Sequence, residues 1–278
     1  MKHQVLKTGI LATVLALLSI GVNAQTLPST PTPPNPLTDY KEFSVAGETI
    51  DSVTVGSRMP YKMDAQTPIY GLTFEYMWEF TPSLAIQSLT GAALTGSANY
   101  YSANEISVVM PAAPGTMTVK TNVRSLFGTT VLCTGTEATN NIRIVPRPTI
   151  KWDASTPVPG CVAQAVSIPL TTLTGNAQFE VAYTIAYYTN FDGTGTPTTT
   201  TGYNVLTSNT TLDFPASVFA SGDGLYEITL TNITDRISRK SLDMSLVAST
   251  AADLPTSAFK VYIYPAPATS PLLHIKNM

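Results

Sequence analysis

Side chains that could do acid-base or nucleophilic chemistry are scarce in this sequence. It contains two histidines, and because His3 lies in an amino-terminal segment with the features of a leader, His274 alone would remain. Hydrolysis through a histidine base and histidine-rich zinc coordination therefore both lack their parts. Carboxylates form only loose pairs, such as Asp192 with Asp223, and glycoside cleavage needs two carboxylates held several ångströms apart in a cleft. The sequence predicts no catalytic residues and no enzyme.

The acidic residues do not form a metal-binding motif either. Four aspartates could supply oxygen ligands for calcium: Asp51, Asp64, Asp192 and Asp223. No loop, however, has the acidic spacing of a known calcium site. Segment 192–195, Asp-Gly-Thr-Gly, is similar to the Asp-Thr-Gly triplet of aspartic proteases with one glycine inserted, and it has no second copy. We interpret it as a turn in a mobile hairpin tip over 190–201, and the sequence predicts no metal and no cofactor.

The chain has two cysteines, Cys133 and Cys161, separated by 28 residues. In an oxidising compartment an even number of cysteines suggests a disulfide, which here would join two parts of the chain across a predicted domain boundary. The alternative is two separate thiols. A disulfide needs Cα atoms within about 7 Å of each other, and the sequence leaves both alternatives open.

The amino terminus has the pattern of a cleavable secretory signal over residues 1–24. Lys2 and Lys7 give a cationic start, residues 10–20 are almost continuously apolar, and Val-Asn-Ala at 22–24 offers the small-x-small pattern of a cleavage site. The alternative, a membrane anchor, needs about 20 apolar residues, and this run is shorter. We therefore expect export to the periplasm, the cell surface or the medium, with Gln25 as the first residue of the mature chain and no membrane span in it.

Composition narrows the class further. Removing Lys2 and Lys7 with the leader leaves thirteen of the fifteen Lys and Arg residues against eighteen Asp and Glu, a formal net charge of about −5. This acidity favours solubility, and a nucleic-acid partner is not expected because clustered basic residues are missing. Residues 25–38 contain five prolines and no acidic or basic side chain, a composition that predicts an extended spacer.

Alternation of apolar and polar residues predicts an all-β mature chain. The clearest example is 224–235, and turn residues stand on both sides of it. Prolines at 146 and 148 mark a boundary, since closely spaced prolines end strand pairing. We expect two tandem immunoglobulin-like β-sandwiches, at 39–147 and 148–265, followed by a tail at 266–278. The expected strands are 48–55, 72–80, 105–110, 117–123, 130–134 and 141–145 in the first sandwich, and 150–152, 165–170, 179–188, 203–208, 209–214, 224–233 and 259–264 in the second.

One predicted strand carries aromatic residues on a single face. Phe74, Tyr76, Trp78 and Phe80 alternate with polar or flexible residues. Such a ladder either anchors a core between two sheets or forms a platform that stacks on carbohydrate.

Several segments resemble the immunoglobulin-like and PKD-like modules of secreted and surface proteins of Bacteroidota. The matching segments in the second sandwich are 159–161, 166–171, 173–185 and 224–235, and those in the first are 76–80 (Tyr-Met-Trp-Glu-Phe) and 110–119. The chain departs from the pattern at 236–240, where Arg-Ile-Ser-Arg-Lys stands in place of Asn-Gly-Cys. The resemblance implies modules for adhesion, spacing or assembly, without catalytic machinery to carry over. If the origin is Bacteroidota, Asp-Ser-Val at 51–53 makes Ser52 a candidate for O-glycosylation.

The sequence thus favours a non-enzymatic envelope or surface protein whose partners are other envelope or surface proteins, or glycans. The alternative is an accessory carbohydrate-binding or weakly hydrolytic secreted protein, suggested by thirteen tyrosines and the aromatic strand around Trp78. Exposure or burial of Trp78 and Tyr76 separates the two hypotheses.

Overall fold

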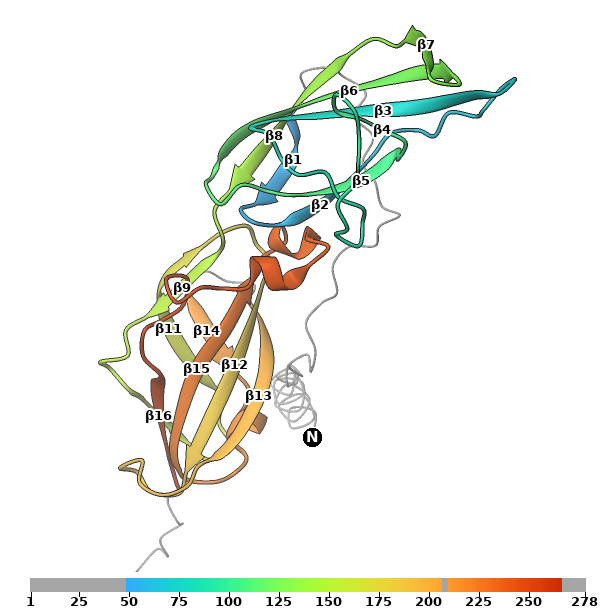
Figure 1. Ribbon diagram of the computed structural model, residues 1–278. Helices are drawn as coiled ribbons and strands as arrows, with labels where there is room; N and C mark the ends of the chain where they lie inside the picture. Colours follow the sequence, from blue (N-terminus) through green and yellow to red (C-terminus); the bar gives the residue numbers. More distant parts are fainter. Residues whose placement is uncertain (1–48, 207–209, 267–278) are drawn as a thin grey trace, which may run out of the picture.

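The computed structural model describes residues 49–206 and 210–266. The predicted signal peptide, the proline-rich spacer and residues 267–278 of the predicted tail lie outside these residues. Within them the structure is nearly all β, as predicted, and the strands fall into two groups that lie end to end (Figure 1). No helix in the described part of the chain is long and apolar enough to cross a bilayer.

The first group is a sandwich of unequal layers. A six-stranded sheet has the order β1-β8-β6-β3-β4, with β7 paired to β6, and a two-stranded sheet of β2 and β5 packs on it. The strands are β1 (Thr49–Thr54), β2 (Arg58–Lys62), β3 (Leu72–Thr81), β4 (Tyr100–Tyr101), β5 (Glu105–Val109), β6 (Gly115–Phe127), β7 (Thr130–Thr134) and β8 (Ala138–Val145).

The second group has better matched layers. A five-stranded sheet of order β10-β16-β15-β12-β13 faces a three-stranded sheet of order β14-β11-β9. The strands are β9 (Thr149–Trp152), β10 (Val158–Cys161), β11 (Val166–Thr174), β12 (Phe179–Tyr188), β13 (Thr198–Leu206), β14 (Thr211–Phe214), β15 (Gly224–Thr234) and β16 (Phe259–Tyr264), and the 3-10 helices are η1 (Ala216–Phe219), η2 (Ser238–Lys240) and η3 (Met244–Val247).

Alternation places the core residues. In β12, Phe179, Val181, Tyr183 and Ile185 are buried between the two sheets, because successive side chains of a strand point to opposite faces. Aromatic rings fill the space between the sheets: Tyr183 meets Phe214 edge-on at 5.0 Å between ring centroids. Such contacts stabilise a core beyond the area that they bury.

Both sandwiches contain a parallel strand pair near their ends. In the first, β1 runs parallel to β8, with Ser52 opposite Arg143 and Thr54 opposite Val145. The first and the last strand of this sandwich are therefore hydrogen-bonded neighbours. In the second, β10 runs parallel to β16, and Cys161 lies opposite Tyr264.

Three predicted strands, β7, β12 and β16, have the bounds that alternation indicates, and three observed strands, β2, β4 and β10, were not predicted. The unpredicted strands β2 and β10 contain Pro60 and Pro159. Proline cannot donate to a strand ladder and is confined to edges, and both strands are indeed at an edge of their sheets. Their proline content conceals them from an analysis based on local sequence.

Candidate functional site

The aromatic ladder of β3 is part of the first core. Trp78 is 3% exposed and Tyr76 is 4% exposed. The Trp78 indole N–H donates to the carbonyl of Ala103 at 3.3 Å. These two rings are covered on both faces, so they do not form a platform for carbohydrate.

A pocket of about 310 Å³ opens beside this strand, and its walls include Glu79, Asn99 and Tyr101. Glu79 accepts a hydrogen bond from the Asn99 amide at 3.4 Å and lies 3.9 Å from the ammonium of Lys120. It is the one carboxylate among the residues that line this pocket. Acid-base cleavage of a glycoside needs a second carboxylate, which the lining does not supply.

The Asp-Gly-Thr-Gly segment forms a turn, as predicted. Asp192 Oδ1 accepts hydrogen bonds from the Thr194 N–H at 2.9 Å and from the Thr194 hydroxyl at 2.7 Å. These bonds lower the pKa of the Asp192 carboxyl below its ordinary value. Asp64, Asp192 and Asp223 do not gather, and the described residues contain no group of three metal-ligating side chains.

The loop that holds this turn makes packing contacts that its composition does not indicate, and its mobility stays a prediction. Phe191 stacks on two tyrosines of β16, with its ring centroid 5.2 Å from that of Tyr264 and 6.4 Å from that of Tyr262. A Cβ on Gly193 would lie 3.3 Å from a methyl carbon of Leu225, which is buried. The loop therefore folds back over the sheet, and β13 begins within the predicted loop, at Thr198.

Cys133 and Cys161 are free thiols in this structure. Cys133 is exposed on β7, at the end of the first sandwich away from the boundary, where β6 and β7 turn back. Cys161 lies opposite Tyr264, at the end of the second sandwich away from the boundary. The candidate disulfide across the boundary is not formed, because the two residues lie at opposite ends of the molecule.

Ser52, the candidate for O-glycosylation, lies in β1 and is half-buried. Its neighbour across the sheet is Arg143. Glycosylation of Ser52 stays a prediction.

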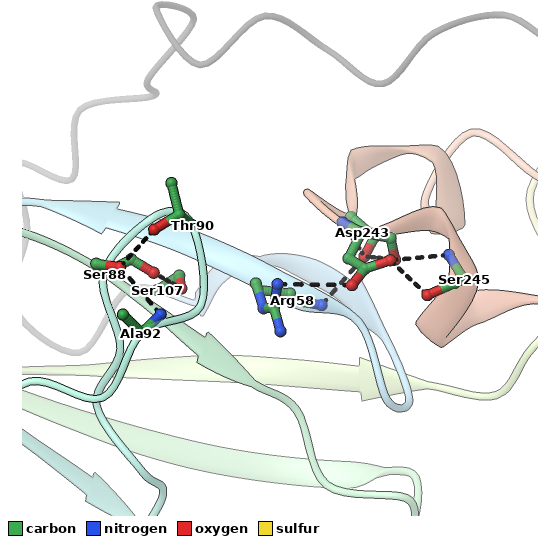
Figure 2. A network of polar contacts seen from close by, with 8 residues as sticks. Arg58, Ser88, Thr90, Ala92, Ser107, Asp243 and Ser245 are labelled. Atoms are coloured by element: carbon green, nitrogen blue, oxygen red, sulfur yellow. Dashed lines mark hydrogen bonds and ion pairs between the residues drawn. The ribbon is translucent and has the colours of Figure 1, made fainter.

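The most elaborate polar arrangement lies where the two sandwiches meet. Arg58, the first residue of β2, donates its N–H to the Ser241 hydroxyl at 3.1 Å, and its carbonyl accepts the Leu242 N–H at 2.8 Å. Its guanidinium Nη1 lies 3.5 Å from Oδ2 of Asp243 (Figure 2). One residue of the first sandwich thus holds the second by its main chain and by its charge.

The linker between the sandwiches is tied down by the same segment. Arg147 Nη2 donates to the carbonyl of Leu246 at 3.1 Å. Gly56 has φ of +74°, and a Cβ there would lie 3.2 Å from both of these partner atoms. A side chain at position 56 would therefore press into the contact.

Segment 236–247, which we call the junction segment, is held firmly to its own sandwich. The carboxylate of Asp235 is buried and accepts the N–H groups of Asn176 at 2.9 Å and Ser238 at 2.7 Å. Arg239 pairs with the buried Glu180 of β12 at 2.5 Å. The junction segment is therefore bonded both to its own sandwich and, through Ser241, Leu242 and Asp243, to Arg58 of the first sandwich.

Asp243 is charged under ordinary conditions. Its Oδ1 accepts hydrogen bonds from the Ser245 hydroxyl at 2.6 Å and from the Ser245 N–H at 3.1 Å, which cap η3. The bonds from Ser245, with a smaller effect of the Arg58 charge, lower the pKa of the Asp243 carboxyl below its ordinary value. The pair with Arg58 therefore persists into acidic solution.

A turn of the first sandwich closes the other side of Arg58. Gly91 has φ of +92°, and a Cβ there would lie 2.9 Å from the guanidinium carbon of Arg58. The turn is fixed by Ser88, whose hydroxyl accepts the Ala92 N–H at 3.1 Å and whose carbonyl accepts the Ser107 hydroxyl at 2.6 Å (Figure 2). These contacts join the two sandwiches on both sides of Arg58.

Sequence reasoning did not find Arg58 and Asp243. They are far apart in the sequence, and neither belongs to a local motif. The one local signal was the departure at 236–240, which begins the junction segment.

No family model matches this chain, and no curated protein matches it. Solved structures that it resembles include the FN1–FN3 domains of chicken CNTN1, at 11% identity over 83% of this chain and 68% of that chain, with a TM-score of 0.36. Others are the fibronectin(III)-like modules of Clostridium thermocellum CbhA, at 14% identity over 84% and 97% of the two chains with a TM-score of 0.32, and a marsupial T cell receptor, at 14% identity over 82% and 74% with a TM-score of 0.35. Because these scores are low, the fold assignment rests on the sheets described above. The resemblance to PKD-like modules and an origin in Bacteroidota stay predictions.

Proposed function

We propose that this chain is an exported, non-enzymatic envelope or surface protein that acts in adhesion, spacing or assembly, with other envelope or surface proteins as partners. The observation that carries the proposal is the junction. Direct bonds from Arg58 to three consecutive residues, Ser241, Leu242 and Asp243, hold the sandwiches end to end. A spacer or scaffold needs domains in a fixed orientation, and tandem domains joined by a flexible linker lack direct bonds of this kind.

The amino-terminal signal supports export, and the scarcity of catalytic side chains supports a role without chemistry. The alternative was an accessory carbohydrate-binding protein whose aromatic ladder stacks on the sugar. Because Trp78 and Tyr76 are buried, the ladder does not support that alternative.

The orientation is tested by small-angle X-ray scattering on the mature chain, residues 25–278. We expect an elongated particle whose distance distribution fits one rigid arrangement. The double substitution R58A with D243A should broaden the distribution without unfolding either sandwich. Glu227→Ala is the matched control, because it removes a surface ion pair with Lys260 (3.4 Å) that lies within one sandwich.

The role is tested by affinity capture of partners from the native envelope, with the mature chain and the R58A/D243A variant as baits. We expect a specific partner that the variant holds less well. Recovery of free monomer alone would contradict an assembly role, and turnover of a substrate by the purified chain would contradict a non-enzymatic one.

A further inference from the structure

Exposed apolar side chains gather at one end of the molecule. Seven large apolar residues are exposed in the described part of the chain, and five of them lie at the end of the first sandwich that points away from the junction (Figure 1). We call this end the apolar tip; its exposed members are Ile69, Tyr70, Phe127, Val131 and Leu132.

Two turns that lie side by side build the apolar tip. In one, the Leu72 N–H donates to the carbonyl of Ile69 at 3.0 Å, and Tyr70 has φ of +50°, which leaves its side chain 95% exposed. The other joins β6 to β7 just after Phe127, which is 61% exposed. The two turns are neighbours because Leu72 pairs with Phe127 across the sheet.

Apolar side chains occupy both faces of the ribbon at this end. Directly paired residues of neighbouring strands point to the same face, and the next pair points to the other face. Leu72 and Phe127 therefore share one face, while Leu126 and Val131 share the opposite one. On that opposite face Val131 is 43% exposed, and Leu126 is buried. A bulge lies between the β6–β7 pairs Leu126–Val131 and Ser125–Cys133, and it adds Leu132, which is 54% exposed.

The apolar tip is also free of charge. Residues 65–74 and 125–136 contain no Asp, Glu, Lys, Arg or His. The nearest charges on the ribbon are Glu75 and Arg124, which pair with each other at 2.6 Å, and the Arg124 guanidinium carbon lies 3.9 Å from the centre of the Tyr100 ring. Exposed sheet edges are ordinarily protected by lysine or proline, and β7, Thr-Val-Leu-Cys-Thr, has neither.

We propose that the apolar tip inserts into the boundary between headgroups and acyl chains of a lipid bilayer, an inference that rests on the proposed envelope location. A protein surface that packs against a sheet covers one of its faces, whereas a fluid bilayer surrounds an inserted end on all sides. Insertion by about 5–10 Å immerses the two turns and leaves the Glu75–Arg124 pair in water. Because the tip has no basic residue, insertion is driven by apolar side chains and not by attraction to anionic lipid.

Flotation of the mature chain with lipid vesicles tests the proposal. The probes are vesicles of phosphatidylcholine and vesicles of phosphatidylcholine mixed with phosphatidylglycerol. We expect similar binding to both, unchanged by added salt. The substitutions F127S with L132S should lower the bound fraction by at least about tenfold, because each removes a large apolar side chain from lipid.

Tyr264→Ser is the matched control, because Tyr264 is also an exposed aromatic residue (47%) but lies at the opposite end of the molecule. It should leave vesicle binding unchanged. Equal losses with Tyr264→Ser and with F127S/L132S would overturn the proposal.

Fluorescence gives a second readout. Both native tryptophans, Trp78 and Trp152, are buried, so their emission should not respond to lipid. In Tyr70→Trp we expect a blue shift when phosphatidylcholine vesicles are added. Binding without a blue shift would mean that another surface meets the lipid, and the proposal would be wrong.

Two further outcomes assign the apolar tip to another occupant and so overturn the proposal. If the chain ignores vesicles but sediments as a dimer that F127S/L132S dissociates, the occupant is a second copy. If it ignores vesicles but a partner captured from the envelope is lost with F127S/L132S, the occupant is that protein. In the latter case the proposed function stands, whereas vesicle binding without any captured partner supports the tip and counts against an assembly role.

Discussion

The two far ends of the molecule differ in how far they cover their apolar side chains. At the far end of the second sandwich, the loop between β12 and β13 folds back, so that Phe191 stacks on Tyr264 and Leu225 is buried. At the far end of the first sandwich, Phe127 and Tyr70 stay bare. The loop therefore covers Leu225 and pairs two aromatic rings that stay partly exposed, Phe191 at 37% and Tyr264 at 47%, whereas the exposed side chains of the apolar tip have no such covering loop.

The layers explain the difference. In the second sandwich a three-stranded sheet covers the inner face of the long strands. In the first, β2 and β5 have five residues each, whereas β6 has thirteen. At about 3.3 Å per residue, β6 extends more than 20 Å beyond what either short strand spans.

The largest loss of stability is expected from a substitution in the core of the second sandwich. Phe214 is completely buried and contacts Tyr183 and Phe219 edge-on. Phe214→Ala should lower the free energy of unfolding of this sandwich by about 3–5 kcal/mol. Urea unfolding, with hydrogen exchange to assign the transition to a sandwich, measures it. A loss below about 1 kcal/mol would mean that the space collapses without cost.

Alkaline pH probes the same core. Burial raises the pKa of the Tyr183 hydroxyl from 10.0 to about 12. Since the folded state favours the neutral phenol, its stabilising effect is complete below pH 10 and is lost as the pH rises towards about 12, by the order of 2 kcal/mol. Tyr183→Phe should lose less stability over this interval than the natural chain. Parallel curves for the two proteins would contradict the assignment.

A substitution in the loop at the far end of the second sandwich should lower the free energy of unfolding by less. Phe191→Ala removes the stack on Tyr262 and Tyr264, and we expect a loss of about 1 kcal/mol. Cleavage by thermolysin within 190–197 should become faster. Unchanged cleavage would show that the hydrogen bonds of Asp192 with Thr194 are enough to hold the loop.

The smallest effect is expected at the open end. Phe127→Ser should change the free energy of unfolding in lipid-free solution by no more than about 0.5 kcal/mol, because the side chain is already in water. Urea unfolding checks it beside Phe214→Ala. A loss comparable to that of Phe214→Ala would mean that Phe127 is packed in solution, and the contrast between the two ends would disappear.

The sequence predicts those parts of this fold that local alternation encodes. Long strands such as β12, with Val181, Tyr183 and Ile185 on one side, follow from period two. Proline-bearing strands such as β2 do not, since Pro60 is tolerated only because its strand lies at an edge.

The junction could not be predicted because it depends on contacts between residues remote in the chain. Arg58 follows a turn in the first sandwich, and Asp243 caps a short 3-10 helix in the second. Nothing local to either indicates the other. The apolar tip was not predicted for a different reason: the strand expected at 117–123 ends before Phe127, Leu132 lies in the strand expected at 130–134, and local sequence does not show how short the facing layer is.

The parallel pairing of β1 with β8 has a mechanical consequence. The chain enters the first sandwich through β1 and leaves it through β8, and the two strands run in the same direction side by side. Tension applied along the polypeptide pulls them past each other, so the backbone bonds that join them bear the load together instead of parting one by one. A tethered molecule built in this way resists extension through its unfolding barrier, so the first sandwich can hold its length while bearing a load.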